Sequence, residues 1–126
     1  MGGRESMTNY ADISVKASVE NVQNLVQHAF AANGFEVKWE NATRGKAEKG
    51  SKGANLMLGA LAQYYGIEFE IFPHAGASTL RLLKANSGWA GGYLGARKVE
   101  KQFDQLSDTL AGWFRQQGAL LGLQKK

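Results

Sequence analysis

The stretch RKVEKQFDQLSDTLAGWFRQQ, from Arg97 to Gln117, determines how the rest of the chain must pack. Its apolar residues return every three or four positions, which is the spacing of one face of an α-helix. The members of this stripe are Val99, Phe103, Leu106, Leu110 and Trp113, widened by Phe114. Polar side chains occupy most of the other positions, and Gly118 ends the pattern. We therefore expect one long amphipathic helix that closes the core of a single small domain.

A strand and a shorter helix are expected at the start of this domain. Residues 10–17 alternate between apolar and polar side chains, which is typical of a half-buried strand. Ser18 can cap a helix that begins at Val19, because serine is a favoured residue at that position. Asn33-Gly34 supplies the helix stop, since both residues tolerate a left-handed backbone.

Four further strands are expected in the middle of the chain, separated by turn residues, over residues 35–40, 44–49, 67–71 and 78–84. The segment from Asn55 to Tyr65 is ambiguous. It contains good helix formers at helical spacing, whereas Leu56, Leu58 and Ala60 alternate as in a strand. Since strands flank it on both sides, we expect extended structure there.

The expected order is strand, helix, four strands, long helix, within a domain that covers residues 9–118. Consecutive hairpins make an antiparallel sheet of about five strands, and both helices must cover its one apolar face. This α+β order over residues 10–118 resembles one repeat of the TATA-box-binding-protein fold and also the helix-grip folds. It is similar to small bacterial domains of unknown function with the same layout. Residues 1–8 are expected to be a mobile leader or an expression remnant, and residues 119–126 a tail.

Composition limits the classes of protein to which the chain can belong. Its 126 residues suit one domain, and 44% hydrophobic with 21% charged residues is an ordinary globular composition. The absence of cysteine excludes disulfides, thiolate metal sites and a thiol nucleophile, and it suits a cytoplasmic location. The longest apolar run, Leu56 to Leu61, is far too short to cross a membrane. A net charge of +4 permits only weak attraction to polyanions.

No set of residues predicts catalysis, a metal site or a cofactor. His28 and His74 have no further ligands at a spacing that a metal would need. The strand carboxylates alternate onto the polar face, where general acid–base chemistry is not favoured: Glu36, Glu40, Glu68 and Glu70. We therefore expect a protein that is not an enzyme.

Two glycine-punctuated apolar stretches, residues 53–60 and 88–96, contain the most informative candidate site. If both lie at one end of the sheet, they form an apolar rim of Leu56, Met57, Leu58, Trp89, Tyr93 and Leu94. Exposed apolar patches of this kind bind a partner, a ligand or a membrane surface. The simpler interpretation, which ordinary packing favours, is that the glycines let these stretches fold down and cap the core.

A run of basic residues forms the second candidate site, an anion patch of Arg44, Lys46, Lys49 and Lys52. Nucleic-acid readers usually interleave exposed aromatic residues with the basic ones, whereas Trp39 and Phe69 are expected to point into the core. A solvated edge is therefore the favoured interpretation. The leading functional hypothesis is a binding module that uses the rim, or the groove between sheet and long helix, for self-association, an apolar ligand or a membrane surface. Nucleic-acid binding through a basic sheet face is the alternative.

Overall fold

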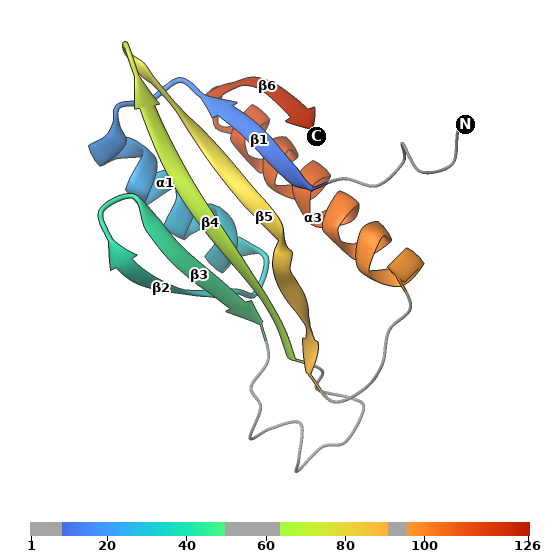
Figure 1. Cartoon of the computed structure of the whole chain (residues 1–126). Coiled ribbons are helices and arrows are strands. Elements are labelled where there is room, and N and C mark those ends of the chain that lie inside the picture. The colour runs from blue at the N-terminus through green and yellow to red at the C-terminus, as the bar shows by residue number, and fades with distance from the viewer. Residues whose placement is uncertain (1–8, 50–63, 91–95) are drawn as a thin grey trace.

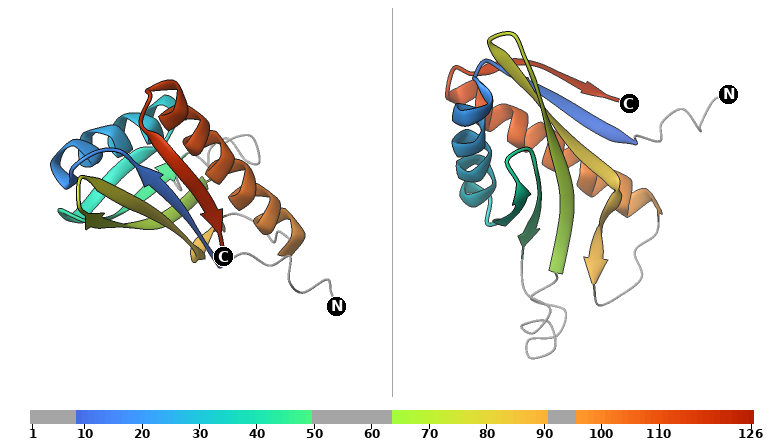
Figure 2. Two further views of the ribbon diagram at one scale, coloured as in Figure 1. Left: turned by 90° about the horizontal axis from the view of Figure 1, so that it is seen from above. Right: turned by 60° about the vertical axis from the view of Figure 1, so that its left-hand side comes forward.

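The computed structural model describes residues 9–49, 64–90 and 96–126, which form a sheet covered by helices on one face (Figure 1). In chain order the elements are β1 (Tyr10–Val15), α1 (Val19–Ala32), β2 (Glu36–Asn41), β3 (Arg44–Lys49), β4 (Tyr64–His74), β5 (Ala77–Ala90), α3 (Ala96–Gln116) and β6 (Leu120–Lys125). The described strands form one antiparallel sheet in the order β2-β3-β4-β5-β1-β6. Figure 2 shows α1 and α3 together on one side of it. The predicted α+β class is therefore confirmed.

The long helix closes the core as the sequence predicts. It runs from Ala96 to Gln116, within one residue of the expected range at each end. The side chains of Phe103, Leu110 and Phe114 are fully buried, together with the strand and α1 residues that they meet. The core residues with no exposed surface include Ile13, Val15, Val22, Val26, Phe30, Ile67, Phe69, Leu80 and Leu82. The apolar face of the sheet and the apolar faces of both helices therefore meet in one buried layer.

The predicted tail is wrong, because residues 120–125 form strand β6. Gly118, at φ +73°, turns the chain after α3, and the Ala119 amide bonds back to the Phe114 carbonyl at 2.9 Å. The chain then returns along β1, where Leu123 lies opposite Ile13. The reason is that β5 pairs with only one edge of β1, and β6 satisfies the backbone groups of the other edge.

Strands β4 and β5 are longer than predicted. The sequence suggested a glycine-rich stretch outside the strands at residues 88–96, whereas residues 88–90 continue β5 and pair with the first residues of β4. Gly66 lies opposite Gly88, yet Glu68 lies opposite Leu83, so β5 carries extra residues at this irregularity. Tyr64 and Tyr65 are in strand β4, whereas the rest of the ambiguous segment lies outside the described residues, as do residues 1–8.

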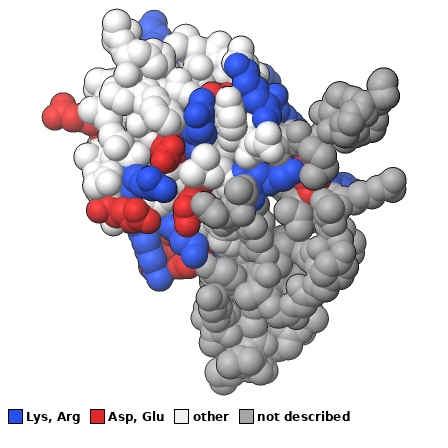
Figure 3. Space-filling view, viewed as in Figure 1, with Lys and Arg blue, Asp and Glu red and all other residues white. Residues whose placement is uncertain are grey.

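The sheet face that carries no helix, here called the open face, has mixed charge. In Figure 3, cationic and acidic side chains lie side by side on this face. Arg81 on β5 donates two hydrogen bonds to Asp12 on β1, at 2.8 and 2.9 Å, and its guanidinium lies 4.0 Å from the Tyr10 ring centroid. Hydrogen bonding to Asp12 is the main cause that raises the pKa of Arg81 above its ordinary value. On β3, Arg44 pairs with Glu70 at 3.1 Å.

Candidate functional site

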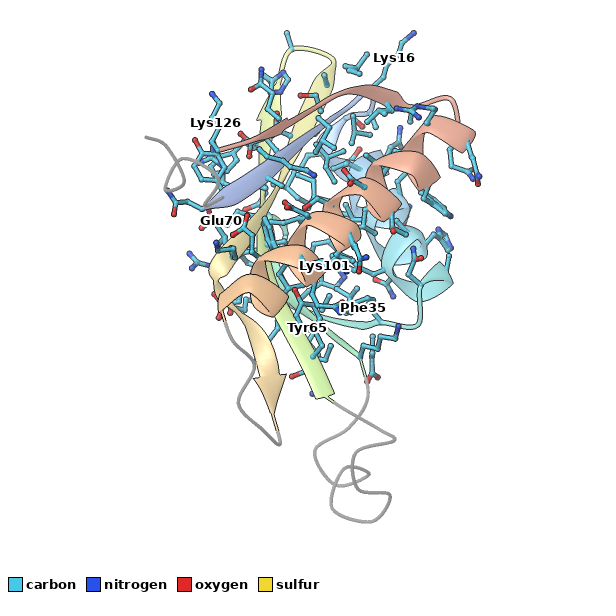
Figure 4. All side chains as sticks on the ribbon, turned by 90° about the vertical axis from the view of Figure 1, so that its right-hand side faces the viewer. Lys16, Phe35, Tyr65, Glu70, Lys101 and Lys126 are labelled. Atoms are coloured by element: carbon cyan, nitrogen blue, oxygen red, sulfur yellow. The ribbon has the colours of Figure 1, made fainter. Side chains whose placement is uncertain are left out.

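A hollow of about 170 Å³ opens between α3 and the end of the sheet, and we call it the α3 hollow. Residues from α3, from the connection between α1 and β2, and from β3 and β4 line it: Asn33, Phe35, Lys49, Tyr65, Gln102, Gln105, Leu106 and Thr109. In Figure 4, Phe35 and Tyr65 lie near each other on the side of the sheet that faces α3. The α3 hollow therefore lies in the groove between sheet and long helix that the sequence suggested as a binding place.

The floor of the α3 hollow consists of aromatic rings that the core holds in place. Phe35 and Tyr65 are 8% and 3% exposed, and their rings meet edge to face with centroids 6.1 Å apart. Behind them, the Phe30 ring meets Phe35 edge to face with centroids 5.5 Å apart, and it stacks on Phe69 with centroids 5.4 Å apart. Aromatic pairs at these separations are favourable beyond their burial alone. The floor is thus a fixed apolar surface.

The connection between α1 and β2 positions Phe35. Gly34 has φ +86°, a left-handed conformation that glycine adopts without strain, and the Phe35 amide bonds to the Phe30 carbonyl at 2.9 Å. The Asn33 side chain donates to the Ala29 carbonyl at 2.8 Å and so closes the last turn of α1. This predicted helix stop therefore also places one ring of the floor.

Lys49, the last residue of β3, brings a positive charge to the α3 hollow. Its Nζ lies 5.7 Å from the centroid of the Phe35 ring, and a Cβ on Gly34 would lie 3.4 Å from its Cε. The aliphatic stem therefore lies along the connection between α1 and β2, with the ammonium group above the aromatic floor.

The polar residues of α3 divide by charge between two sides of the helix. Amide and hydroxyl side chains four or fewer residues apart line the α3 hollow, namely Gln102, Gln105 and Thr109. The acidic side chains are directed to lysines of neighbouring strands: Glu100 to Lys84, and Asp104 and Asp108 to Lys125 at 3.7 and 2.9 Å. Among the described residues that line the α3 hollow, Lys49 is the one that carries a charge.

A further hollow of about 270 Å³, the amide hollow, lies between α1 and the hairpin of β2 and β3. Its lining is Gln23, Asn24, Gln27, Trp39, Asn41 and Ala42. Two of its amides already bond within the fold, since Gln23 donates to the Ala42 carbonyl and Gln27 accepts from the Trp39 indole at 2.8 Å. Because Gln23 and Gln27 are already engaged within the fold, this hollow is the weaker candidate.

Most of the predicted rim lies outside the described residues, namely Leu56, Met57, Leu58, Tyr93 and Leu94. The backbone of Trp89 is in β5, opposite Tyr65. The points where the two glycine-rich stretches join the described chain are adjacent, because Lys49 pairs with Tyr65 and Tyr64 pairs with Ala90. Both stretches are therefore attached at the end of the sheet that holds the α3 hollow, and the rim itself stays a prediction.

The structure does not bring the residues of the predicted anion patch together. Arg44 and Lys46 are on the open face, where Lys46 lies 3.6 Å from Glu48. Lys49 has the opposite parity on β3 and shares the helix-covered face with Gly45 and Ala47. Lys52 lies outside the described residues. The alternation of β3 was already visible in the sequence, and it separates Lys49 from the other cations.

The histidines take no part in the α3 hollow. His28 is exposed on α1, and a ring nitrogen of His74 lies 2.9 Å from the Thr79 hydroxyl. Over the three described ranges, no group of three histidine or acidic side chains could hold a metal ion. Nor does any helix in this part of the chain have the length and apolar character to span a membrane.

No protein-family model matches this chain, and no match is found among curated proteins. The interpretation of the site therefore depends on its own geometry. Among the described residues that line the α3 hollow, Lys49 is the one that belonged to a site predicted from the sequence. Three of the others, Gln102, Gln105 and Thr109, are spaced so that they border Leu106 on one side of the helix.

Proposed function

We propose that this domain is a non-enzymatic binding module, which holds a small aromatic group of one or two fused rings in the α3 hollow. The observation that supports this proposal is the combination of a buried aromatic floor, from Phe35 and Tyr65, with uncharged polar side chains above it. Small-molecule sites are typically concave and mostly apolar, with a few polar groups that orient the ligand.

The dimensions of the α3 hollow suit a small group. An engineered apolar cavity of about 150 Å³ binds benzene, and the α3 hollow has about 170 Å³. Leu106 and the two rings offer apolar contact to such a group, while Gln102 and Gln105 can exchange hydrogen bonds with polar substituents.

The open face gives less support to the alternative function, nucleic-acid binding. Its arginines, Arg44 and Arg81, are engaged by Glu70 and Asp12, and phosphate groups would have to compete with these carboxylates. Exposed bases would find the Tyr10 ring covered by the Arg81 guanidinium. The apolar ligand is therefore the better-supported function.

A titration with 2-naphthylmethanol, a neutral aromatic probe, tests the proposal. Amide chemical shifts in ¹⁵N-labelled protein should change most for the residues that line the α3 hollow. Thr109→Trp should weaken binding at least tenfold, because the larger side chain takes up the hollow. Gln116→Trp is the matched control, since it adds the same ring to an exposed position on α3 that does not line the hollow.

Shift changes spread over the whole surface, or equal binding by both tryptophan variants, would contradict the proposal. The unfolding temperatures of the two variants must also agree within a few degrees, because a misfolded Thr109→Trp would lose binding for an irrelevant reason.

A further inference from the structure

The charges around the α3 hollow are distributed unevenly. Among the residues that the structure describes, its lining contains one cation, Lys49, and no carboxylate. The carboxylates of α3 that are nearest in sequence to the lining residues pair with lysines outside the hollow. Asp104 and Asp108 pair with Lys125 on β6, and Glu100 pairs with Lys84 on β5. From the described part of the lining, a ligand in the α3 hollow therefore meets one positive charge and neutral dipoles.

The neighbouring carboxylate on β3 does not neutralise Lys49. Glu48 is on the open face of the sheet, where it pairs with Lys38 at 3.0 Å and with Lys46 at 3.6 Å. Side chains of adjacent strand residues point to opposite faces, so the sheet itself separates Glu48 from Lys49.

We infer that the α3 hollow selects aromatic ligands that carry a negative charge, with Lys49 as the residue that determines this selectivity. The inference depends on the function proposed above and deepens it by naming the ligand class, a small aromatic carboxylate. The ring contacts the floor of Phe35 and Tyr65, and the carboxylate accepts a hydrogen bond from the Lys49 ammonium group. Gln102 and Gln105 can donate to the remaining carboxylate lone pairs.

The position of Lys49 supports this assignment. Its ammonium lies 5.7 Å from the centroid of Phe35, a ring that forms part of the floor. A ring bound against that floor thus brings its substituent close to the cation without any large movement of the side chain. Because Lys49 is exposed, water and salt screen the pair, and we expect a contribution near the upper end for an accessible ion pair, about fivefold in affinity.

The experiment compares three probes of nearly equal shape at neutral pH: 2-naphthoate, 2-naphthylmethanol and 2-naphthylmethylamine. The expected order of affinity is anion, then neutral probe, then cation, with about fivefold between the first two. Lys49→Gln should remove the preference for the anion, so that 2-naphthoate and 2-naphthylmethanol bind this variant with equal affinity. Lys46→Gln makes the same change of net charge on the open face and should leave the preference intact.

Salt provides an independent measurement. The affinity of wild-type protein for 2-naphthoate should fall as sodium chloride is raised, whereas that of Lys49→Gln should not, because screening acts only on the charge pair.

Each outcome bears on one of the two proposals. If 2-naphthoate and 2-naphthylmethanol bind the α3 hollow equally well and Lys49→Gln does not change their relative affinity, the selectivity is refuted while the proposed function stands. If Lys46→Gln lowers the affinity for 2-naphthoate as much as Lys49→Gln does, general charge attraction explains the preference and the inference is likewise refuted. If none of the probes binds, the proposed function fails and the inference fails with it.

Discussion

Alanine in place of Gly45 should destabilise the domain, whereas alanine in place of Gly112 should stabilise it. Gly45 is buried in β3, and a Cβ there would lie 2.9 Å from the Lys38 carbonyl oxygen and 2.9 Å from Cζ of Phe69. Real Cβ atoms essentially never approach so closely. The carbonyl belongs to the paired strand β2, and the ring is fully buried, so neither can move freely.

The magnitude follows from two opposing effects. Overpacking a core site destabilises by about 1–3 kcal/mol, and the lower entropy of the unfolded chain returns about 0.4–1 kcal/mol. The net loss for Gly45→Ala is therefore about 1–2 kcal/mol, or roughly 3–8 °C in unfolding temperature for a domain of this size. Gly112 is inside α3, and a Cβ there would have no atom within 4 Å. Only the helix propensity then remains, which favours alanine by about 0.8–1 kcal/mol.

Urea and thermal unfolding followed by circular dichroism measure both changes. The denaturant slope must be equal in both variants, so that the midpoints report stability and not a change in the compactness of the unfolded state. An unchanged or raised stability of Gly45→Ala would refute the close approach of β2, β3 and Phe69 that underlies the aromatic floor. The opposite sign at Gly112 shows that the assay can detect stabilisation.

Other substitutions test the scaffold around the site. Phe103→Ala should destabilise by about 3–5 kcal/mol, because this fully buried ring leaves a cavity beneath α3; a loss below 1 kcal/mol in urea unfolding would contradict its burial. Arg81→Met should destabilise by about 1–2 kcal/mol, since it leaves the Asp12 carboxylate without its bidentate partner, and the double variant with Asp12→Asn should recover part of this loss. Deletion of residues 119–126 should remove cooperative unfolding or cause aggregation by exposing the edge of β1, and a monomeric, stable variant in size-exclusion chromatography would contradict the role of β6.

Local patterns were sufficient for the elements that pack through their own periodicity. The stripe of α3 predicted a helix to within one residue at each end, and Ser18 caps α1 by accepting from the Asn21 amide at 3.4 Å. Alternation also located β1 and β2, because one face of β1 is buried and the same face of β2 is half-buried, whereas β3 was expected only as a polar strand that returns after a turn.

Strand β6 could not be found in this way. Leu120, Leu121 and Leu123 do not alternate, and Gly122 weakens the strand tendency, so local propensity does not favour extended structure there. What makes these residues a strand is the vacant edge of β1, more than 100 positions earlier in the chain, where Ala11 pairs with Lys125. Such a partner is invisible to a local pattern. The same applies to residues 88–90, which open a glycine-rich stretch in the sequence but pair with the start of β4 in the structure.

The α3 hollow was anticipated only as a groove between sheet and helix. Its lining comes from four separate parts of the chain, and no local pattern brings Asn33 and Lys49 next to Gln105. Lys49 was recognised as a cation but grouped with Arg44 and Lys46, from which the parity of β3 separates it. Counting positions along the strand would have corrected that grouping.

The pairing of β1 with β6 has a consequence for the order in which the domain can fold. The first and last strands are hydrogen-bonded out to the backbone of Asn9 and Lys126, at 3.1 Å. Bringing β1 and β6 together closes a loop that contains nearly the whole chain, which is entropically unfavourable until other contacts have formed. The hairpin of β2 and β3 pairs strands that are adjacent in sequence and can form early. During synthesis on the ribosome we therefore expect β1 to keep an unpaired edge until β6 has left the exit tunnel. The newly made chain is open to pairing with other strands throughout that interval, and it is then that chaperones would protect it.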